Sequence, residues 1–122
     1  MSWIDDRLMV GGDIDLWPDD KFRADVDFII DIRNWFLYRG QDCWPGSLMS
    51  ERVEVISGLA DRGWKLFIRC AGGIDRSPFV AALYYAKRHG VSLEEAYRVV
   101  KEKRPQTLEH PEWFEFIPRW LP

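Results

Sequence analysis

One short segment combines a possible nucleophile, a strong cation and a glycine-containing turn. It reads Cys70-Ala71-Gly72-Gly73-Ile74-Asp75-Arg76-Ser77. Backbone N–H groups of such a turn can converge on a single anion, and a helix that begins directly after the turn adds the positive end of its dipole. The pattern therefore predicts that the backbone of residues 71–76 binds an anion of the phosphate type.

The side chains of this segment suggest covalent chemistry on the bound anion. The positive field of a helix N-terminus favours the thiolate of Cys70, which is the nucleophilic form. Arg76 can hold two oxygens of the anion at once with its planar fork, and Ser77 can donate a hydrogen bond to the sulfur and help it leave. The competing interpretation of the same residues is an inert buried thiol at Cys70 and a surface charge at Arg76.

The flanking sequence supplies the elements that would position this loop. Residues 64–69 predict a strand that leads into Cys70, and Pro78 stands in the first turn of a predicted helix over residues 79–89, capped by Gly90. Residues 26–32 are nearly all apolar and rich in β-branched side chains, which predicts a strand covered on both faces at the sheet centre.

The rest of the chain alternates between strand-like and helical patterns. Residues 4–10 predict an edge strand or hairpin, residues 35–38 a short strand, and residues 39–46 a surface loop. Helices are predicted over residues 17–25, from residue 47 to a cap at Gly63, from the capping box at residues 92–95 to Pro105, and over residues 111–120. This alternation favours an α/β sandwich with a parallel core, built as one domain over residues 1–122.

Composition narrows the class of protein. The chain has 122 residues, of which 47% are hydrophobic and 30% charged, and its net charge of −3 argues against a nucleic-acid-binding protein. It has no apolar run of the ~18 residues that a membrane span needs and no signal-peptide pattern, so we expect a soluble cytoplasmic protein. The two cysteines are too few for a disulfide framework and form no zinc-binding pattern, so no metal is expected. We also expect no cofactor and a monomeric protein.

The loop 70–78, the strand before it and the stretch over residues 90–105 resemble the dual-specificity branch of the protein tyrosine phosphatases. Residues 7–12 and 26–33 are similar to the first strands of that family, and the chain has the size of a small atypical member. The resemblance implies a compact phosphatase fold, with a central four- or five-stranded, mainly parallel sheet flanked by helices. It also implies metal-independent hydrolysis of phosphomonoesters through a cysteinyl-phosphate on Cys70.

One residue departs from the family pattern. Arg69 stands where the family usually has His, immediately before the nucleophile. As a neighbouring cation it can favour the thiolate, or it can face solvent or pair with an acid.

The resemblance also implies a general acid, an Asp on a separate loop some thirty residues before the Cys. Asp42 fits that position, while Asp75 is the competitor, because myotubularin-like and certain bacterial phosphatases active on phosphoinositides carry Asp there. Asp75 can instead order the loop by accepting backbone hydrogen bonds. Cys43 can form a reversible disulfide with Cys70 or remain a free thiol.

The expected substrate is protein phosphotyrosine, with phosphoserine and phosphothreonine as further candidates, so the expected partner is a phosphoprotein or phosphopeptide. A phosphoinositide or small-molecule phosphatase is the first alternative, favoured by Asp75 but disfavoured by the lack of Lys in the loop. A non-catalytic pseudophosphatase that binds phosphate is the second, suggested by Arg69. A rhodanese-like sulfurtransferase also uses a Cys loop, but the spacing of six residues from Cys70 to Arg76 and the distant Asp fit a phosphatase better.

Overall fold

A mainly parallel four-stranded sheet forms the centre of the fold. The structure is a computed structural model that describes residues 1–12 and 25–117. The sheet contains β1 (Ser2–Trp3), β2 (Leu8–Gly12), β6 (Leu66–Cys70) and β3 (Phe28–Asp31), in that spatial order. Strand β6 pairs in parallel with both β2 and β3, and only β1 is antiparallel, to β2. The predicted α/β fold with a mainly parallel sheet is confirmed.

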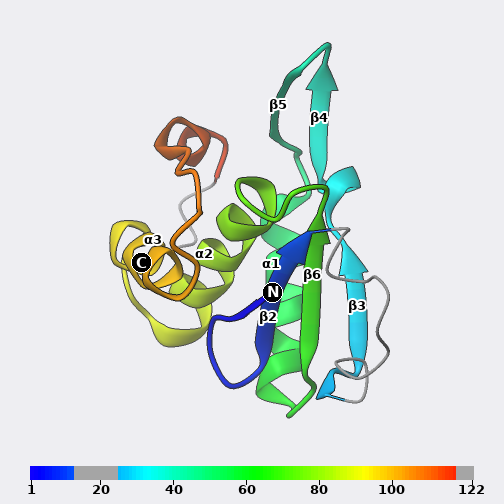
Figure 1. Cartoon of the computed structure of the whole chain (residues 1–122), viewed down its shortest axis with the longest axis vertical. Coiled ribbons are helices and arrows are strands. Elements are labelled where there is room, and N and C mark those ends of the chain that lie inside the picture. The colour runs from blue at the N-terminus through cyan, green and yellow to red at the C-terminus, as the bar shows by residue number, and fades with distance from the viewer. Residues whose placement is uncertain (13–24, 118–122) are drawn as a thin grey trace.

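Besides the sheet, the part of the chain that the structure describes contains three α-helices. They are α1 (Met49–Asp61), α2 (Arg76–His89) and α3 (Leu93–Lys103), and short 3-10 helices run over Arg33–Trp35 (η3) and Pro111–Phe116 (η4). In Figure 1, α1 lies behind the sheet, α2 lies beside β2, and α3 lies beyond α2. The predicted caps are confirmed: Gly90 ends α2 with φ of 67°, and the hydroxyl of Ser92 accepts the amide of Glu95 at the start of α3.

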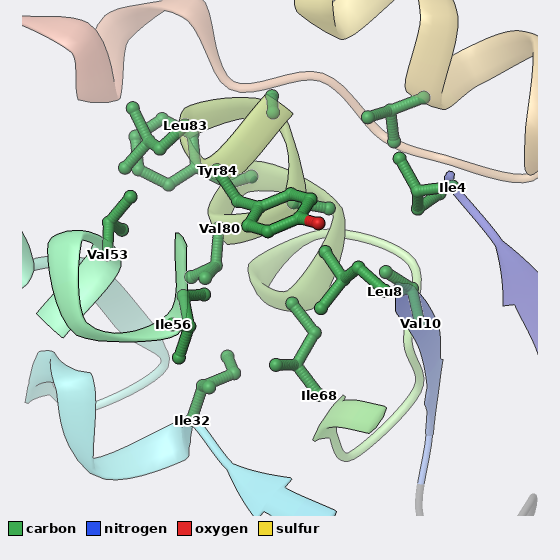
Figure 2. Packing of buried hydrophobic residues seen from close by; sticks show 14 of the residues in the cluster. Ile4, Leu8, Val10, Ile32, Val53, Ile56, Ile68, Val80, Leu83 and Tyr84 are labelled. Carbon is green, nitrogen blue, oxygen red and sulfur yellow. The ribbon is translucent and has the colours of Figure 1, made fainter. Parts of the chain in front are cut away.

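The main hydrophobic core lies between one face of the sheet and the helices. Figure 2 shows Leu8 and Ile68 of the sheet facing Ile56 of α1 and Val80 of α2. All four side chains are buried. Successive side chains of a strand point to opposite faces of the sheet. Along β6, Leu66 and Ile68 therefore face the helices, while Phe67 packs on the opposite face with Met9 and Val26. The close packing fixes the carboxyl end of β6, where the predicted loop begins.

The prediction of a central strand over residues 26–32 is wrong in position and extent. Strand β3 covers only Phe28–Asp31 and forms one edge of the described sheet, while β6 takes the centre. Phe28 and Ile29 are 43% and 38% exposed. A continuous apolar run is typical of a buried strand, but here part of its apolar surface is satisfied locally by an edge-to-face contact between Phe28 and Trp64, with 5.4 Å between ring centroids.

The prediction of a surface loop over residues 39–46 is also wrong, because most of this segment is in strands. Strand β4 (Phe36–Arg39), which confirms the short strand predicted there, pairs in an antiparallel hairpin with β5 (Asp42–Pro45). Gly40 makes the tight turn with φ of 60°, a conformation that costs glycine little. The turn-rich composition therefore marks a hairpin, and this hairpin extends from the end of the sheet at which β6 ends (Figure 1).

The last predicted helix is shorter and tighter than expected. Within the described part of this segment, residues 111–117, η4 forms and Ile117 after it is extended, with φ of −101° and ψ of 124°. The next residue in the sequence is Pro118, which disfavours a helical conformation for the residue before it. The helix predicted over residues 17–25 lies outside the described residues, apart from Asp25. Trp120, at the end of the last predicted helix, also lies outside them. No helix among the described residues is long and apolar enough to span a membrane.

Candidate active site

The loop of residues 71–75 joins the central strand to the N-terminus of α2. Cys70 is the last residue of β6 and is fully buried, and Asp75 is the N-cap of α2. The carboxylate of Asp75 accepts the amide of Arg76 at 2.8 Å, so the helix begins at Arg76, earlier than predicted. The loop therefore places the thiol directly below a helix N-terminus, as the sequence pattern requires.

Two backbone amides converge on the sulfur of Cys70. The amide of Gly73 donates to Sγ at 3.2 Å, and the amide of Ser77 donates to it at 3.4 Å. Donors aimed at a sulfur stabilise its anionic form, and they do so most effectively where water is excluded. The hydroxyl of Ser77, which was predicted to reach the sulfur, donates instead to the carbonyl oxygen of Gly11 at 3.4 Å.

Arg104 braces the loop from the side of α3. It is 4% exposed, its Nε donates to the carbonyl oxygen of Gly73, and its Nη1 donates to the hydroxyl of Ser2 at 3.1 Å. Gly73 itself has φ of 67° and lies against the backbone of Gly11 and Gly12 in β2. A charged hydrogen bond in a buried place is among the stronger single contacts, so Arg104 holds the loop against the sheet. No local sequence pattern indicates this contact, because 31 residues separate Arg104 from Gly73.

Arg76 lies beside the loop and contacts the β4–β5 hairpin. Its Nη1 donates to the hydroxyl of Tyr38 at 2.6 Å, and its guanidinium lies 5.7 Å from the centroid of the Tyr38 ring. Its Nε lies 3.9 Å from the carboxylate of Asp75. Burial opposes the charge, but the hydrogen bond to Tyr38 and the negative groups nearby raise the pKa of Arg76 above its ordinary value. Sequence reasoning did not identify Tyr38.

Asp75 also faces a histidine from the segment before η4. The Nε2 of His110 lies 3.6 Å from Asp75 Oδ2, and the Nδ1 of His110 lies 2.9 Å from a carboxylate oxygen of Glu112. The His110 ring stacks on Trp113, with 3.8 Å between centroids. Asp75 therefore has three roles within reach: N-cap of α2, neighbour of Arg76 and partner of His110.

The structure distinguishes the two interpretations of Arg69. Its guanidinium pairs with the carboxylate of Asp31 at 3.3 Å, and Arg33 binds the same carboxylate at 2.6 Å. The hydrogen bonds from Arg33, together with the charge of Arg69, hold the pKa of Asp31 below its ordinary value although burial opposes this. Arg69 thus pairs with an acid across the β3–β6 register, one of the two possibilities left open by the sequence.

The hairpin carries the other two candidate residues. Asp42 opens β5 opposite Arg39 and is exposed, and Cys43 lies opposite Tyr38. Both cysteines are free thiols, so no Cys43–Cys70 disulfide is present. Burial is the main reason that the pKa of Cys43 is raised, and the charge of Asp75 adds to it while that of Arg76 opposes it. These influences place Cys43 in the electrostatic environment of the loop.

Comparison with solved structures identifies the class of fold. The chain is similar to human DUSP28, with a TM-score of 0.71, 18% identity and coverage of 95% of this chain and 92% of that one. It is also similar to DUSP15, with a TM-score of 0.76, 18% identity and coverage of 95% and 83%, and to Tk-PTP in its active form, with a TM-score of 0.71, 23% identity and coverage of 94% and 91%. The chain therefore has the phosphatase fold of these neighbours.

Sequence comparison then gives the family. The model of the family "Dual specificity phosphatase, catalytic domain" matches residues 46–120, and the chain belongs to this family. It is 30% identical over 83 residues to the protein-tyrosine-phosphatase IBR5 of Arabidopsis thaliana, covering 68% of this chain and 32% of that protein. It is 52% identical over 57 residues to human dual specificity protein phosphatase 16, covering 47% and 9%. The match thus spans at most about a third of the length of these two relatives.

Proposed function

We propose that the chain hydrolyses phosphomonoesters of proteins, with phosphotyrosine as the main substrate and phosphoserine and phosphothreonine as further ones. The thiolate of Cys70 attacks phosphorus, so that an S–P bond forms while the P–O bond to the leaving group breaks. Asp42 gives its proton to the leaving oxygen. Water then attacks phosphorus and gives a proton to Asp42, the S–P bond breaks, and inorganic phosphate leaves.

The observation that carries this proposal is the convergence of the Gly73 and Ser77 amides on the sulfur of Cys70, at 3.2 and 3.4 Å. An anion above the sulfur can be received by the backbone of residues 71–76 and by the guanidinium of Arg76, which lies beside the loop. Membership of the dual-specificity phosphatase family supports the same assignment. The expected partner is therefore a phosphoprotein or phosphopeptide.

The contacts of Asp75 favour Asp42 as the general acid. The Asp75 carboxylate is engaged as the N-cap of α2 and faces His110, whereas Asp42 lies exposed on the hairpin that contacts Arg76 through Tyr38. A positioned general acid contributes about 10²–10⁴-fold in rate. We therefore expect Asp42→Asn to lower kcat on phenyl phosphate by at least about 10²-fold, and much less on substrates whose leaving group needs no proton.

The matched variant is Asp75→Asn, which keeps the size of the side chain and an oxygen able to cap α2. It should lower kcat by less than about tenfold, because its effect is on the loop. The loss should be the same on phenyl phosphate and on a substrate whose leaving group needs no proton. Steady-state kinetics on the two substrates measures both variants. The opposite ranking would give the role of acid to Asp75 and would strengthen the alternative of a phosphoinositide phosphatase.

The direct test is hydrolysis of p-nitrophenyl phosphate by the wild type and by Cys70→Ser, from pH 5 to 8 and in the presence of a chelator. We expect turnover in the wild type and none in the variant. A panel of phosphotyrosine, phosphoserine and phosphoinositide substrates then separates the alternatives. A well-folded wild type that binds phosphate without turnover would be the pseudophosphatase instead.

A further inference from the structure

The hydroxyl of Tyr38 is held in place from two sides. It donates to the carbonyl oxygen of Arg33 at 2.7 Å and accepts from Nη1 of Arg76 at 2.6 Å. A phenol hydroxyl has one hydrogen to donate, so the bond to Arg33 fixes the direction in which its lone pairs face Arg76. The position of the oxygen is therefore defined, although the Tyr38 side chain as a whole is half exposed.

The contact with Arg76 is more than a single hydrogen bond. The guanidinium carbon lies 5.7 Å from the centroid of the Tyr38 ring, within the range of a cation–π interaction. The hydroxyl and the ring together restrict both the place and the tilt of the guanidinium. A long side chain that is restrained before the ligand arrives loses less entropy when it binds.

Arg76 contacts Tyr38 through Nη1, which leaves another edge of the guanidinium available to bind phosphate. Bidentate binding of two phosphate oxygens uses two neighbouring N–H groups of the planar fork. Tyr38 binds Nη1, so the edge formed by Nε and Nη2 remains on the opposite side. The carboxylate of Asp75 stands 3.9 Å from Nε, beyond hydrogen-bond distance.

Tyr38 also belongs to the hairpin that carries the proposed acid. It pairs with Cys43 across the hairpin, and the next pair is Arg39 with Asp42. The bond between Tyr38 and Arg76 joins residues that are 38 positions apart in sequence. It thus links the hairpin that carries the acid to the first residue of α2.

We propose that Tyr38 is a positioning residue, which holds Arg76 in the orientation that binds phosphate and ties the β4–β5 hairpin to the phosphate loop. This inference rests on the proposed function, because it names a further residue of the same site. Tyr38 acts through Arg76 and takes no part in bond making or breaking. Its hydroxyl should therefore affect phosphate affinity, while the shape of the pH profile stays unchanged.

The test uses Tyr38→Phe, which removes only the hydroxyl, and Tyr85→Phe as the matched control. Tyr85 is on α2 with its ring against His89, away from the loop. A hydrogen bond to a charged group in a half-exposed place accounts for about a tenfold change in affinity. We expect Tyr38→Phe to weaken inorganic phosphate binding, measured by calorimetry, and kcat/KM each by about tenfold. Tyr85→Phe should leave both within twofold of the wild type, within about 0.4 kcal/mol.

A double-mutant cycle with Arg76→Lys shows whether the effect passes through Arg76. In that background, Tyr38→Phe should weaken phosphate binding by less than about twofold. Unchanged phosphate affinity in Tyr38→Phe, or a full tenfold effect that persists with Arg76→Lys, would overturn the inference. Calorimetry reads the affinity whether or not the protein turns over substrate, so a failure of the proposed catalysis is distinguished from a failure of Tyr38.

Discussion

Gly73→Ala and Gly90→Ala form a matched pair that tests how the loop between β6 and α2 is packed. Both glycines have φ of 67°, so alanine is strained to the same degree at either position. A methyl group at Gly90 meets nothing within 4 Å. At Gly73 it would lie 2.5 Å from the carbonyl carbon of Gly11 and 2.6 Å from the amide nitrogen of Gly12.

The difference between the two variants can be worked from these contacts. The left-handed conformation costs alanine roughly 1–2 kcal/mol at each site. Only Gly73→Ala adds overpacking, roughly 1–3 kcal/mol, and its two nearest neighbours are backbone atoms of β2, which cannot rotate away. The overlap of the added methyl group with β2 can be relieved only if the loop shifts. That shift would disturb the amide of Gly73, whose nitrogen lies 3.2 Å from the sulfur of Cys70.

Urea denaturation and phosphatase kinetics measure the two consequences. We expect Gly90→Ala to lose about 1–2 kcal/mol of unfolding free energy and to keep wild-type kcat/KM. Gly73→Ala should lose about 2–5 kcal/mol and at least about tenfold in kcat/KM. Equal losses of stability in the two variants, or full activity in Gly73→Ala, would refute the packing argument.

Two further predictions concern titrating groups. Burial opposes the ionisation of Asp5, but hydrogen bonds from its neighbours, among them His89 and Tyr84, hold its pKa below the ordinary value. Asp5→Asn should therefore cost about 1–3 kcal/mol at pH 7. This difference should shrink as the pH falls below about 4, because the unfolded wild type then binds the proton more readily than the folded one. Because the pKa of Cys43 is raised by burial and by the charge of Asp75, iodoacetamide should label it in Cys70→Ser only slowly below about pH 9, and faster in Asp75→Asn/Cys70→Ser.

Urea denaturation across pH checks the first of these, and mass spectrometry of labelled protein checks the second. An Asp5→Asn penalty that stays constant down to pH 3 would show that the lost contacts do not depend on the carboxylate charge. Rapid labelling of Cys43 at pH 7 would show that its thiol is not shielded by the loop.

The strand, turn and helix start around Cys70 could be predicted from sequence because their determinants are local. A strand that ends at Cys70, two glycines and a helix start follow one another within a few residues, and each has its own sequence signal. The supporting contacts could not be predicted in this way. Tyr38 and Arg104 reach the loop across 38 and 31 residues, and neither a periodicity nor a turn motif encodes such a meeting.

The two wrong predictions about the fold, for residues 26–32 and 39–46, have a common cause. The predictions for the apolar run around Phe28 and for the turn-rich run around Gly40 rest on composition alone. Composition indicates how much surface an element can bury, but the order of strands and the pairing of β4 with β5 depend on which partners are available in space. The hairpin matters most, because it brings Tyr38 to Arg76 and carries Asp42.

We propose Cys70 as the nucleophile that carries the phosphoryl group. This role is tested most directly by mixing the protein with excess p-nitrophenyl phosphate, quenching in acid within one turnover, and mapping the phosphoryl group by peptide mass spectrometry, with Cys70→Ser as the control. We predict a phosphoryl group on the Cys70 peptide of the wild type and none on any peptide of the variant. Turnover without a phosphorylated Cys70 peptide, or activity that survives in Cys70→Ser, would contradict the account.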